Sequence, residues 1–519
     1  MTRGFITDTI RKILQLLYQA ARHGARPLPY SSRKLIPVVK TVKFAVLLFW
    51  LVMLGLLIER TYLRPAAVIA LDASTTEGIR TGDEWFGIYQ QGRKIGHAHT
   101  RVLAQPETYH LTQEMELDLL VLGSVQRIRT VINSYTTRNF LLKYFDFALT
   151  SDNSSMEIKG AVVRSKLILD ITSGGQTRTE RITLKDPPYL SLNIKPAIVL
   201  LGLEPGKKYR FPLFNPATMS SEEASVTVES RERIKVGDRS QNVYKLKETF
   251  QGLEAYSWMT EEGDTLKEES PLGYVLLKES MTEAMKRDKK GPALDIMSLV
   301  MIPADRIENA AGTRYLKAKF SSVPLQGFEL HGGRQILSGA GIEVRVPDTA
   351  GSYSLPYPGK DHADSLVASA LIQSDDRKIR EQAAKVLAGE TNAREAARKL
   401  NQWVYNTIRK QPVVSIPSAL DVLNQRVGDC NEHTVLYTAL ARAAGIPTRM
   451  AAGIVYMRDG FYYHAWPEVW LSEWTAIDPT FNQFPADATH IRFITGNLDR
   501  QADILRLVGK LKVEVLEYK

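Results

Sequence analysis

The stretch Gly428-Asp429-Cys430-Asn431-Glu432-His433-Thr434-Val435-Leu436 holds the only cysteine of the 519 residues. It predicts a helix that begins at Cys430, because Asp429 suits the N-cap position and Glu432 completes a capping box. Gly445 and Pro447 then mark the end of the helix. The unpaired N–H groups of the first turn favour an anion, so we expect the thiol pKa to fall toward that of a reactive thiolate. A buried structural cysteine is the alternative.

A histidine and an aspartate follow Cys430 in the order and setting of a nucleophilic triad. His464 lies on the second of three predicted strands, and Asp478 directly follows the third. These strands cover residues 448–456, 462–471 and 474–477. A nucleophilic thiolate needs a base to accept its proton, and the base needs a third group to fix its tautomer. The sequence therefore indicates Cys430, His464 and Asp478 as candidate catalytic residues.

The register of the hairpin that joins His464 to Asp478 stays open. Both residues are equally far from Leu471, so a hairpin centred there would place them opposite each other on adjacent strands. Ser472-Glu473 is the more natural turn tip.

Four segments of this region resemble the three sequence blocks of the transglutaminase-like superfamily. They are Gly428-Asp429-Cys430, residues 439–449, residues 464–469, and Trp474 with Ile477-Asp478-Pro479-Thr480. The resemblance covers roughly residues 380–485 and implies a papain-like α+β domain. It also implies that Cys430 is the nucleophile, His464 the general base and acid, and Asp478 the residue that orients the histidine. The superfamily includes protein cross-linkers, peptidases, peptide N-glycanases and inactive members.

Further side chains are candidates for the substrate cleft. Trp466 and Glu468 share the strand face of His464 by the two-residue period, where they would wall the cleft or pack against the helix. His433 is one helical turn from Cys430 and would cap or polarise the floor of the site, or be solvated. For the side chain that stabilises the oxyanion, the sequence leaves three candidates open: Trp403, Tyr405 and Gln425.

Metal binding is the less favoured interpretation of these residues. Cys430 and His433 have Cys-x-x-His spacing, and the set would be completed by His464, Asp478 or His490. Zinc sites usually bring more than one cysteine. His97 and His99 face one side of a predicted strand without a third ligand nearby. We therefore expect no metal and no cofactor.

An uninterrupted apolar run, FAVLLFWLVMLGLLI, occupies Phe44–Ile58. It is shorter than the ~20 residues of a comfortable membrane span, but snorkelling by Lys43 and Arg60 extends its reach. A cleaved signal peptide would need a small-residue cleavage site, which does not follow the run. A buried core helix would be striped rather than apolar on every side. We expect a transmembrane signal anchor over residues 44–60.

The positive charge of the chain is concentrated before this run. The formal net charge is +10, and residues 1–43 hold nine Lys/Arg and one acid, which leaves about +2 for the rest. The positive-inside rule places residues 1–43 in the cytoplasm and the remainder outside it. No basic stripe with interleaved aromatics occurs after residue 60, so we expect no nucleic-acid partner. A lone exported cysteine forms no internal disulfide and would stay free.

Between the apolar run and Cys430 the sequence is rich in predicted strands. Alternating runs recur roughly every ten residues, a spacing typical of an antiparallel sheet, half-barrel or sandwich. The first hairpin is expected to turn at Gln91-Gly92-Arg93. A charged hinge follows at residues 285–292. Helices are expected around residues 196–203 and over residues 377–387 and 393–408.

Together these patterns predict a multidomain chain with an N-terminal transmembrane helix, antiparallel β-rich modules and a C-terminal papain-like α+β domain. The predicted parts are a cytoplasmic tail (1–43), the anchor (44–60), a β-rich module (80–285), a small β unit (293–350), the transglutaminase-like catalytic domain (360–490) and a C-terminal extension (491–519).

The favoured function is a cysteine-nucleophile acyl transferase or hydrolase. It would act on amides of proteins or peptides, cell-wall peptides included, from a single-pass position in the inner membrane with the catalytic domain periplasmic. One alternative is a catalytically silent binding scaffold of the cell envelope. A second is a lipid or envelope-assembly factor in which the β-rich module is primary.

Overall fold

The computed structural model describes residues 79–519, apart from residues 80, 122–123, 153, 238, 289–294, 296–300, 348–350, 412, 414–415 and 497. The predicted cytoplasmic tail and membrane anchor lie outside the described residues. Within the described part of the chain, no helix is both long and apolar enough to span a membrane. All the described residues belong to one compact unit, Ala67–Lys519.

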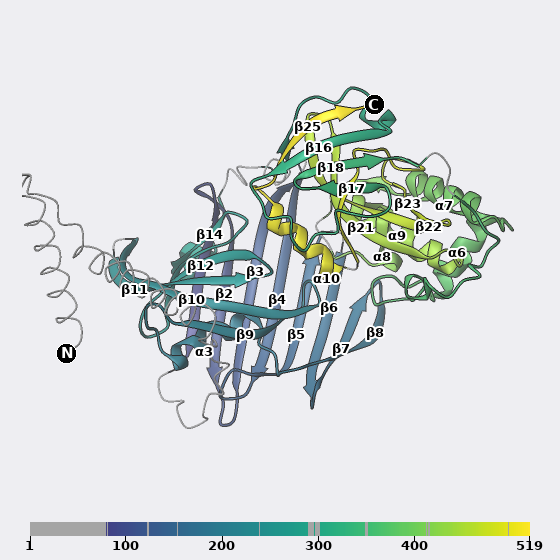
Figure 1. The fold of residues 1–519 in the computed structure, drawn as a ribbon. Helices are drawn as coiled ribbons and strands as arrows, with labels where there is room; N and C mark the ends of the chain where they lie inside the picture. The colour runs from purple at the N-terminus through teal and green to yellow at the C-terminus, as the bar shows by residue number, and fades with distance from the viewer. Residues whose placement is uncertain are drawn as a thin grey trace, which may run out of the picture. The chain divides into compact units, whose positions relative to one another are not determined.

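A 14-stranded antiparallel sheet forms the β-rich module (Figure 1). Its strands pair in the order β8-β7-β6-β5-β4-β3-β2-β1-β14-β13-β12-β11-β10-β9. Two runs of hairpins therefore meet where β1 pairs with β14. The strands are β1 (Gly82–Gln90), β2 (Arg93–Ala104), β3 (Tyr109–Val121), β4 (Ser124–Thr136), β5 (Leu142–Ser151), β6 (Ser154–Val163), β7 (Lys166–Ser173), β8 (Gln176–Thr183), β9 (Lys208–Asn215), β10 (Ser220–Val236), β11 (Arg239–Phe250), β12 (Leu253–Met259), β13 (Thr265–Glu269) and β14 (Tyr274–Glu279).

The first hairpin turns where the sequence predicts it. Gln91 and Gly92 both have positive φ, 49° and 76°, as a two-residue turn with the twist of the flanking strands requires. The predicted helix at residues 196–203 begins earlier, as α3 (Ser191–Leu201). Its start is set by packing, because Leu192 and Ile194 are buried in the main core of the module.

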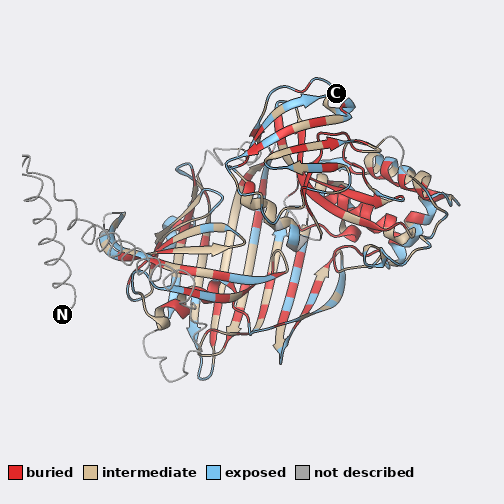
Figure 2. Ribbon diagram, viewed as in Figure 1, coloured by how far each residue is buried: buried red, intermediate tan, exposed pale blue. Residues whose placement is uncertain are grey.

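In the C-terminal α+β domain, helix α9 packs against a five-stranded sheet with the order β15-β22-β21-β24 and β23 on β22, and three more helices pack on α9. The helices of this domain are α6 (Arg377–Leu387), α7 (Ala393–Thr407), α8 (Ala419–Gln425) and α9 (Cys430–Ala443), and its strands are β15 (Ile302–Pro303), β21 (Thr448–Met457), β22 (Gly460–Trp470), β23 (Trp474–Ala476) and β24 (Ile491–Thr495). Helix α9 is largely buried between the other helices and this sheet (Figure 2).

The segment predicted as a C-terminal extension supplies strands to two sheets. β24 pairs with β21 of the α+β domain. β25 (Lys512–Tyr518) pairs with β16 (Tyr315–Ser321) in the small β unit, beside β18 (Gly341–Arg345) and β17 (Gln335–Ser338). The remaining short elements are α4 (Met281–Ala284), α10 (Leu498–Gln501), β19 (Arg409–Lys410), β20 (Val427–Gly428), and the 3₁₀ turns Ala310–Gly312, Ala363–Ser365 and Ala502–Leu507.

Edge strand β8 of the β-rich module lies against the helical side of the α+β domain. Arg178 Nη2 pairs with Asp375 Oδ1 at 2.6 Å, and the Ala370 N–H donates to Glu180 at 3.0 Å. Leu371 joins the hydrophobic core of the module. These side-chain contacts join β8 to the α+β domain.

Candidate active site

Helix α9 places Cys430 at its first residue, as the sequence predicts. Asp429 is the N-cap and accepts from the Asn431 N–H at 2.9 Å, while Glu432 Oε2 accepts from the Asp429 N–H at 2.8 Å. Gly445 follows the C-cap with φ of 80°, a conformation that favours glycine. The predicted capping box and helix bounds are confirmed. Cys430 is free and half-buried.

The expected direction of the Cys430 pKa shift is wrong. Burial raises the pKa of the thiol above its ordinary value, and the neighbouring Asp429 carboxylate adds to the rise. The Ala465 backbone N–H faces the sulfur and acts in the opposite direction. Burial and the Asp429 charge therefore outweigh the Ala465 hydrogen bond, which favours the thiolate. A nearby base has to take the proton.

His464 lies in the middle of β22, opposite Gly453 of β21. A side chain on residue 453 would overlap the Ile491 carbonyl and approach the Trp466 ring to 2.8 Å, so only glycine lets the three neighbouring strands close up here. The His464 ring stacks on Phe481, with centroids 5.0 Å apart and planes 9° apart. This packing fixes the plane of the imidazole.

Asp478 lies just beyond β23, in the turn that contains Pro479. Trp470 pairs with Trp474, so the β22–β23 hairpin is centred on Ser472, and a hairpin centred on Leu471 is excluded. Asp478 Oδ1 accepts from the Thr480 N–H at 2.6 Å and the Phe481 N–H at 3.2 Å. The Asp-Pro-Thr sequence thus forms a side-chain-capped turn that points the other carboxylate oxygen at His464.

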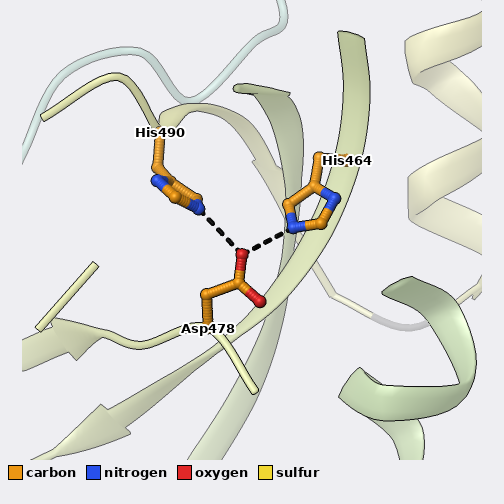
Figure 3. Close-up of side chains that lie close together, drawn as sticks. All are labelled: His464, Asp478 and His490. Atoms are coloured by element: carbon orange, nitrogen blue, oxygen red, sulfur yellow. Dashed lines mark hydrogen bonds and ion pairs between the residues drawn. The ribbon is translucent and has the colours of Figure 1, made fainter. Parts of the chain in front are cut away.

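Figure 3 shows His464, Asp478 and His490 gathered around one carboxylate oxygen. Asp478 Oδ2 lies 2.7 Å from His464 Nε2 and 2.9 Å from His490 Nε2, and all three side chains are buried. Burial acts to raise the pKa of Asp478, but the charge and hydrogen bonds of the two histidines hold that pKa far below its usual range. An ionised carboxylate can only accept, so both Nε2 atoms carry protons, and Nδ1 of His464 is left to accept one.

His490 extends this network to a second acid. Its Nδ1 lies 3.1 Å from Asp487 Oδ1. Burial opposes a charge on the ring, but hydrogen bonds to Asp478 and Asp487 raise the pKa of His490 above its ordinary value. A protonated His490 donates from both nitrogens and holds Asp478 ionised and in place. No sequence motif marks Asp487 or Phe481; the three-residue spacing of Asp487 and His490, directly before a strand, is the one local signal.

We expect His490→Gln to destabilise the fold most in mild acid. The folded-state pKa of His490 is raised, so its contribution is fully present below the unfolded value near ~6.5 and is lost as pH rises through the folded value. The variant should lose roughly 1.5–3 kcal/mol of unfolding free energy near pH 5–6, and the loss should shrink at alkaline pH. Urea unfolding across pH measures this, with exposed His331→Gln as control. A loss of unfolding free energy that does not change with pH would contradict the ion pairing of protonated His490 with Asp478 and Asp487.

The three predicted cleft residues lie behind the site rather than at an opening. Trp466 and His433 are 1% and 0% exposed. The His433 Nδ1 contacts the Asp429 carbonyl oxygen at 2.6 Å, its Nε2 has no hydrogen-bond partner, and burial lowers its pKa. Glu468 is buried and ion-paired with Arg449. Direct contact of these side chains with substrate stays a prediction.

Among the described residues, one cluster has the spacing of metal ligands, namely His464, Asp478 and His490, whose ligand atoms lie within 4.8 Å of one another. It includes neither Cys430 nor His433, the pair considered from sequence. The ligand atoms are already joined as donors and acceptors, so a hydrogen-bond network accounts for the cluster.

Two of the oxyanion candidates have other contacts in the structure. Trp403 packs on the helical core, and the Lys410 ammonium lies 3.6 Å from the centroid of the Tyr405 ring.

Comparison with known proteins bears on this region. Residues 380–479 match the family model described as the transglutaminase-like superfamily. No curated protein matches the sequence. Similar solved structures include a proposed cysteine protease from Cytophaga hutchinsonii (15% identity, 40% of this chain and 87% of that chain, TM-score 0.26) and the periplasmic domain of TgpA from Pseudomonas aeruginosa (15%, 34% and 92%, 0.21). A third is a beta-barrel-like protein of unknown function from Brucella abortus (8%, 39% and 95%, 0.31).

Proposed function

We infer, from the membership of residues 380–479 in the transglutaminase-like superfamily, that the chain is a cysteine-dependent acyl transferase or hydrolase acting on peptide or side-chain amides. The observation that carries this proposal is the hydrogen bond between His464 Nε2 and Asp478 Oδ2. This bond leaves Nδ1 of His464 as the proton acceptor. The backbone N–H of the next residue, Ala465, faces the Cys430 sulfur.

The proposed reaction proceeds through an acyl-enzyme. His464 Nδ1 takes the thiol proton, and the Cys430 sulfur attacks the amide carbonyl carbon. The oxyanion that forms meets the backbone N–H of Cys430 at the start of α9. The imidazolium returns its proton to the departing amine as the C–N bond breaks, and Asp478 stabilises the imidazolium meanwhile. Water then yields a carboxylic acid, or an amine yields a new amide, and Cys430 regains its proton.

The test is trapping with two probes on wild type and on Cys430→Ala. An amide-bearing peptide library is supplied alone and with a biotinylated alkylamine. We expect a thioester at Cys430, with carboxylate products for a hydrolase or biotinylated peptide for a cross-linker. Both signals should be lost in Cys430→Ala. Equal signals in the two proteins, or none in either, would favour the silent scaffold or the β-rich module as the functional part.

We also propose that residues 44–60 anchor the chain in the inner membrane with the domain of residues 380–479 on the periplasmic side. The support is the sequence itself: an apolar run preceded by nine basic residues and one acid. On that side of the membrane the substrates would be envelope proteins or peptides. The thiol would then work without a disulfide partner, since the chain has one cysteine.

A further inference from the structure

A cavity of about 400 Å³ lies between the β-rich module and the α+β domain. Strands β8 and β10 supply one wall, with Ile182 and Ser221, and α9 and β22 supply another, with Thr434 and Ala465. We call it the interface cavity. Its volume falls in the range of small-ligand sites, and its lining combines aliphatic side chains, such as Ile182 and Val435, with hydroxyl, amide and charged ones.

The interface cavity adjoins the candidate nucleophile. Cys430 itself is not among its lining residues, but Thr434 lies one helical turn further along the same face of α9, and the Ala465 N–H faces the sulfur. Thr434 is 1% exposed and its Oγ1 has no hydrogen-bond partner. The cavity therefore lies beside the face of α9 that carries Cys430.

The charges on the cavity wall are mostly negative. Glu180 and Glu222 both line it. Arg500 also lines it, but its guanidinium is directed at Glu329, 3.5 Å away. Aliphatic side chains beside two carboxylates suit a segment with an apolar stem and a basic end, as a lysine-containing peptide provides.

We propose that the interface cavity is the acyl-donor subsite of this enzyme and that it holds an aliphatic, basic-ended side chain of a peptide substrate. This rests on the function proposed above for Cys430. The β-rich module then has a stated role, because β8 and β10 build the half of the subsite that the transglutaminase-like domain lacks. Substrate selection by this chain depends on the module, whereas the chemistry depends on the domain.

The test compares the alkylation rates of Cys430 in the full chain by iodoacetamide, N-hexyl iodoacetamide and N-(6-aminohexyl) iodoacetamide. Burial of several methylenes should make wild type favour the hexyl reagent by about tenfold or more after correction for intrinsic reactivity. Ile182→Trp fills the cavity and should reduce this preference to within about twofold. Thr183→Trp is the matched control, because Thr183 is exposed and alternates to the other face of β8.

A second variant distinguishes a filled cavity from misfolding of Ile182→Trp. Ser221→Trp enters the same cavity from an exposed position on β10 and should have the same effect as Ile182→Trp. Glu222→Gln should lower the rate of the aminohexyl reagent alone. A wild type without preference for the hexyl reagent, or a preference that survives both tryptophans, overturns the subsite. Uniformly slow reaction with all three reagents, with the preference intact, would instead count against the proposed chemistry at Cys430.

Discussion

His464→Ala should slow the alkylation of Cys430 at neutral pH by about 100-fold or more. The reason is the raised pKa of Cys430. Burial and the Asp429 carboxylate disfavour the thiolate, and the hydrogen bond from the Ala465 N–H does not offset them. Ionisation at neutral pH therefore requires an acceptor for the proton, and His464 has Nδ1 free because its Nε2 is bonded to Asp478. Without the imidazole, the sulfur stays a thiol.

The measurement is the rate of iodoacetamide labelling of Cys430 as a function of pH. Wild type should already react near neutrality through the thiolate–imidazolium pair, whereas His464→Ala should gain rate only as alkaline pH ionises the thiol. His331→Ala, which removes an exposed histidine of the small β unit, is the control and should match wild type. Identical pH profiles in wild type and His464→Ala would show that His464 is not the base that accepts the Cys430 proton.

Much of this site follows from local sequence. The N-cap, the capping box and the C′ glycine of α9 are short-range features, so the helix and the position of Cys430 could be predicted to the residue. The network behind Asp478 could not be predicted. Asp487 and His490 lie in a loop without periodicity, and their meeting with Asp478 depends on how that loop returns after β23.

The direction of the Cys430 pKa shift could not be predicted from sequence, for a different reason. A helix N-terminus can be read from sequence, but the depth of burial depends on packing by β22 and by loops far along the chain. Ala465 approaches the sulfur only because β22 crosses the start of α9. Electrostatic expectations drawn from one element alone therefore failed at this position, although the element itself was correct.

The sheets show the same division between local and distant information. Alternation and turn residues predicted the consecutive hairpins, including the turn at Gln91-Gly92. The pairing of β1 with β14 joins segments almost two hundred residues apart, roughly the full length of the module, and no local pattern encodes it. The return of β25 to β16 is equally remote. Long-range strand pairings of this kind depend on which sheet edges are still exposed after the local hairpins have formed.

Glu468→Ala should cost about 3–5 kcal/mol of unfolding free energy, because Glu468 is a buried member of an ion-pair network. Its carboxylate, 2% exposed, accepts from Arg449 at 2.6 and 2.8 Å and from Arg492 at 3.2 Å. Arg492 is itself buried and also donates to the carbonyls of Glu329 and Gly332 in the small β unit. Removal of the carboxylate leaves a guanidinium buried without a counter-charge between the two sheets.

Urea unfolding at fixed pH measures this loss, and Glu381→Ala is the matched control. Glu381 pairs with Arg377 on the exposed face of α6, at 3.1 Å, and its loss should change stability by no more than about 0.5 kcal/mol. The double variant Glu468→Leu/Arg492→Met should be more stable than Glu468→Ala alone, because it removes the uncompensated charge together with its partner. Native-like stability of Glu468→Ala together with a loss of substrate turnover would instead support contact of Glu468 with the substrate.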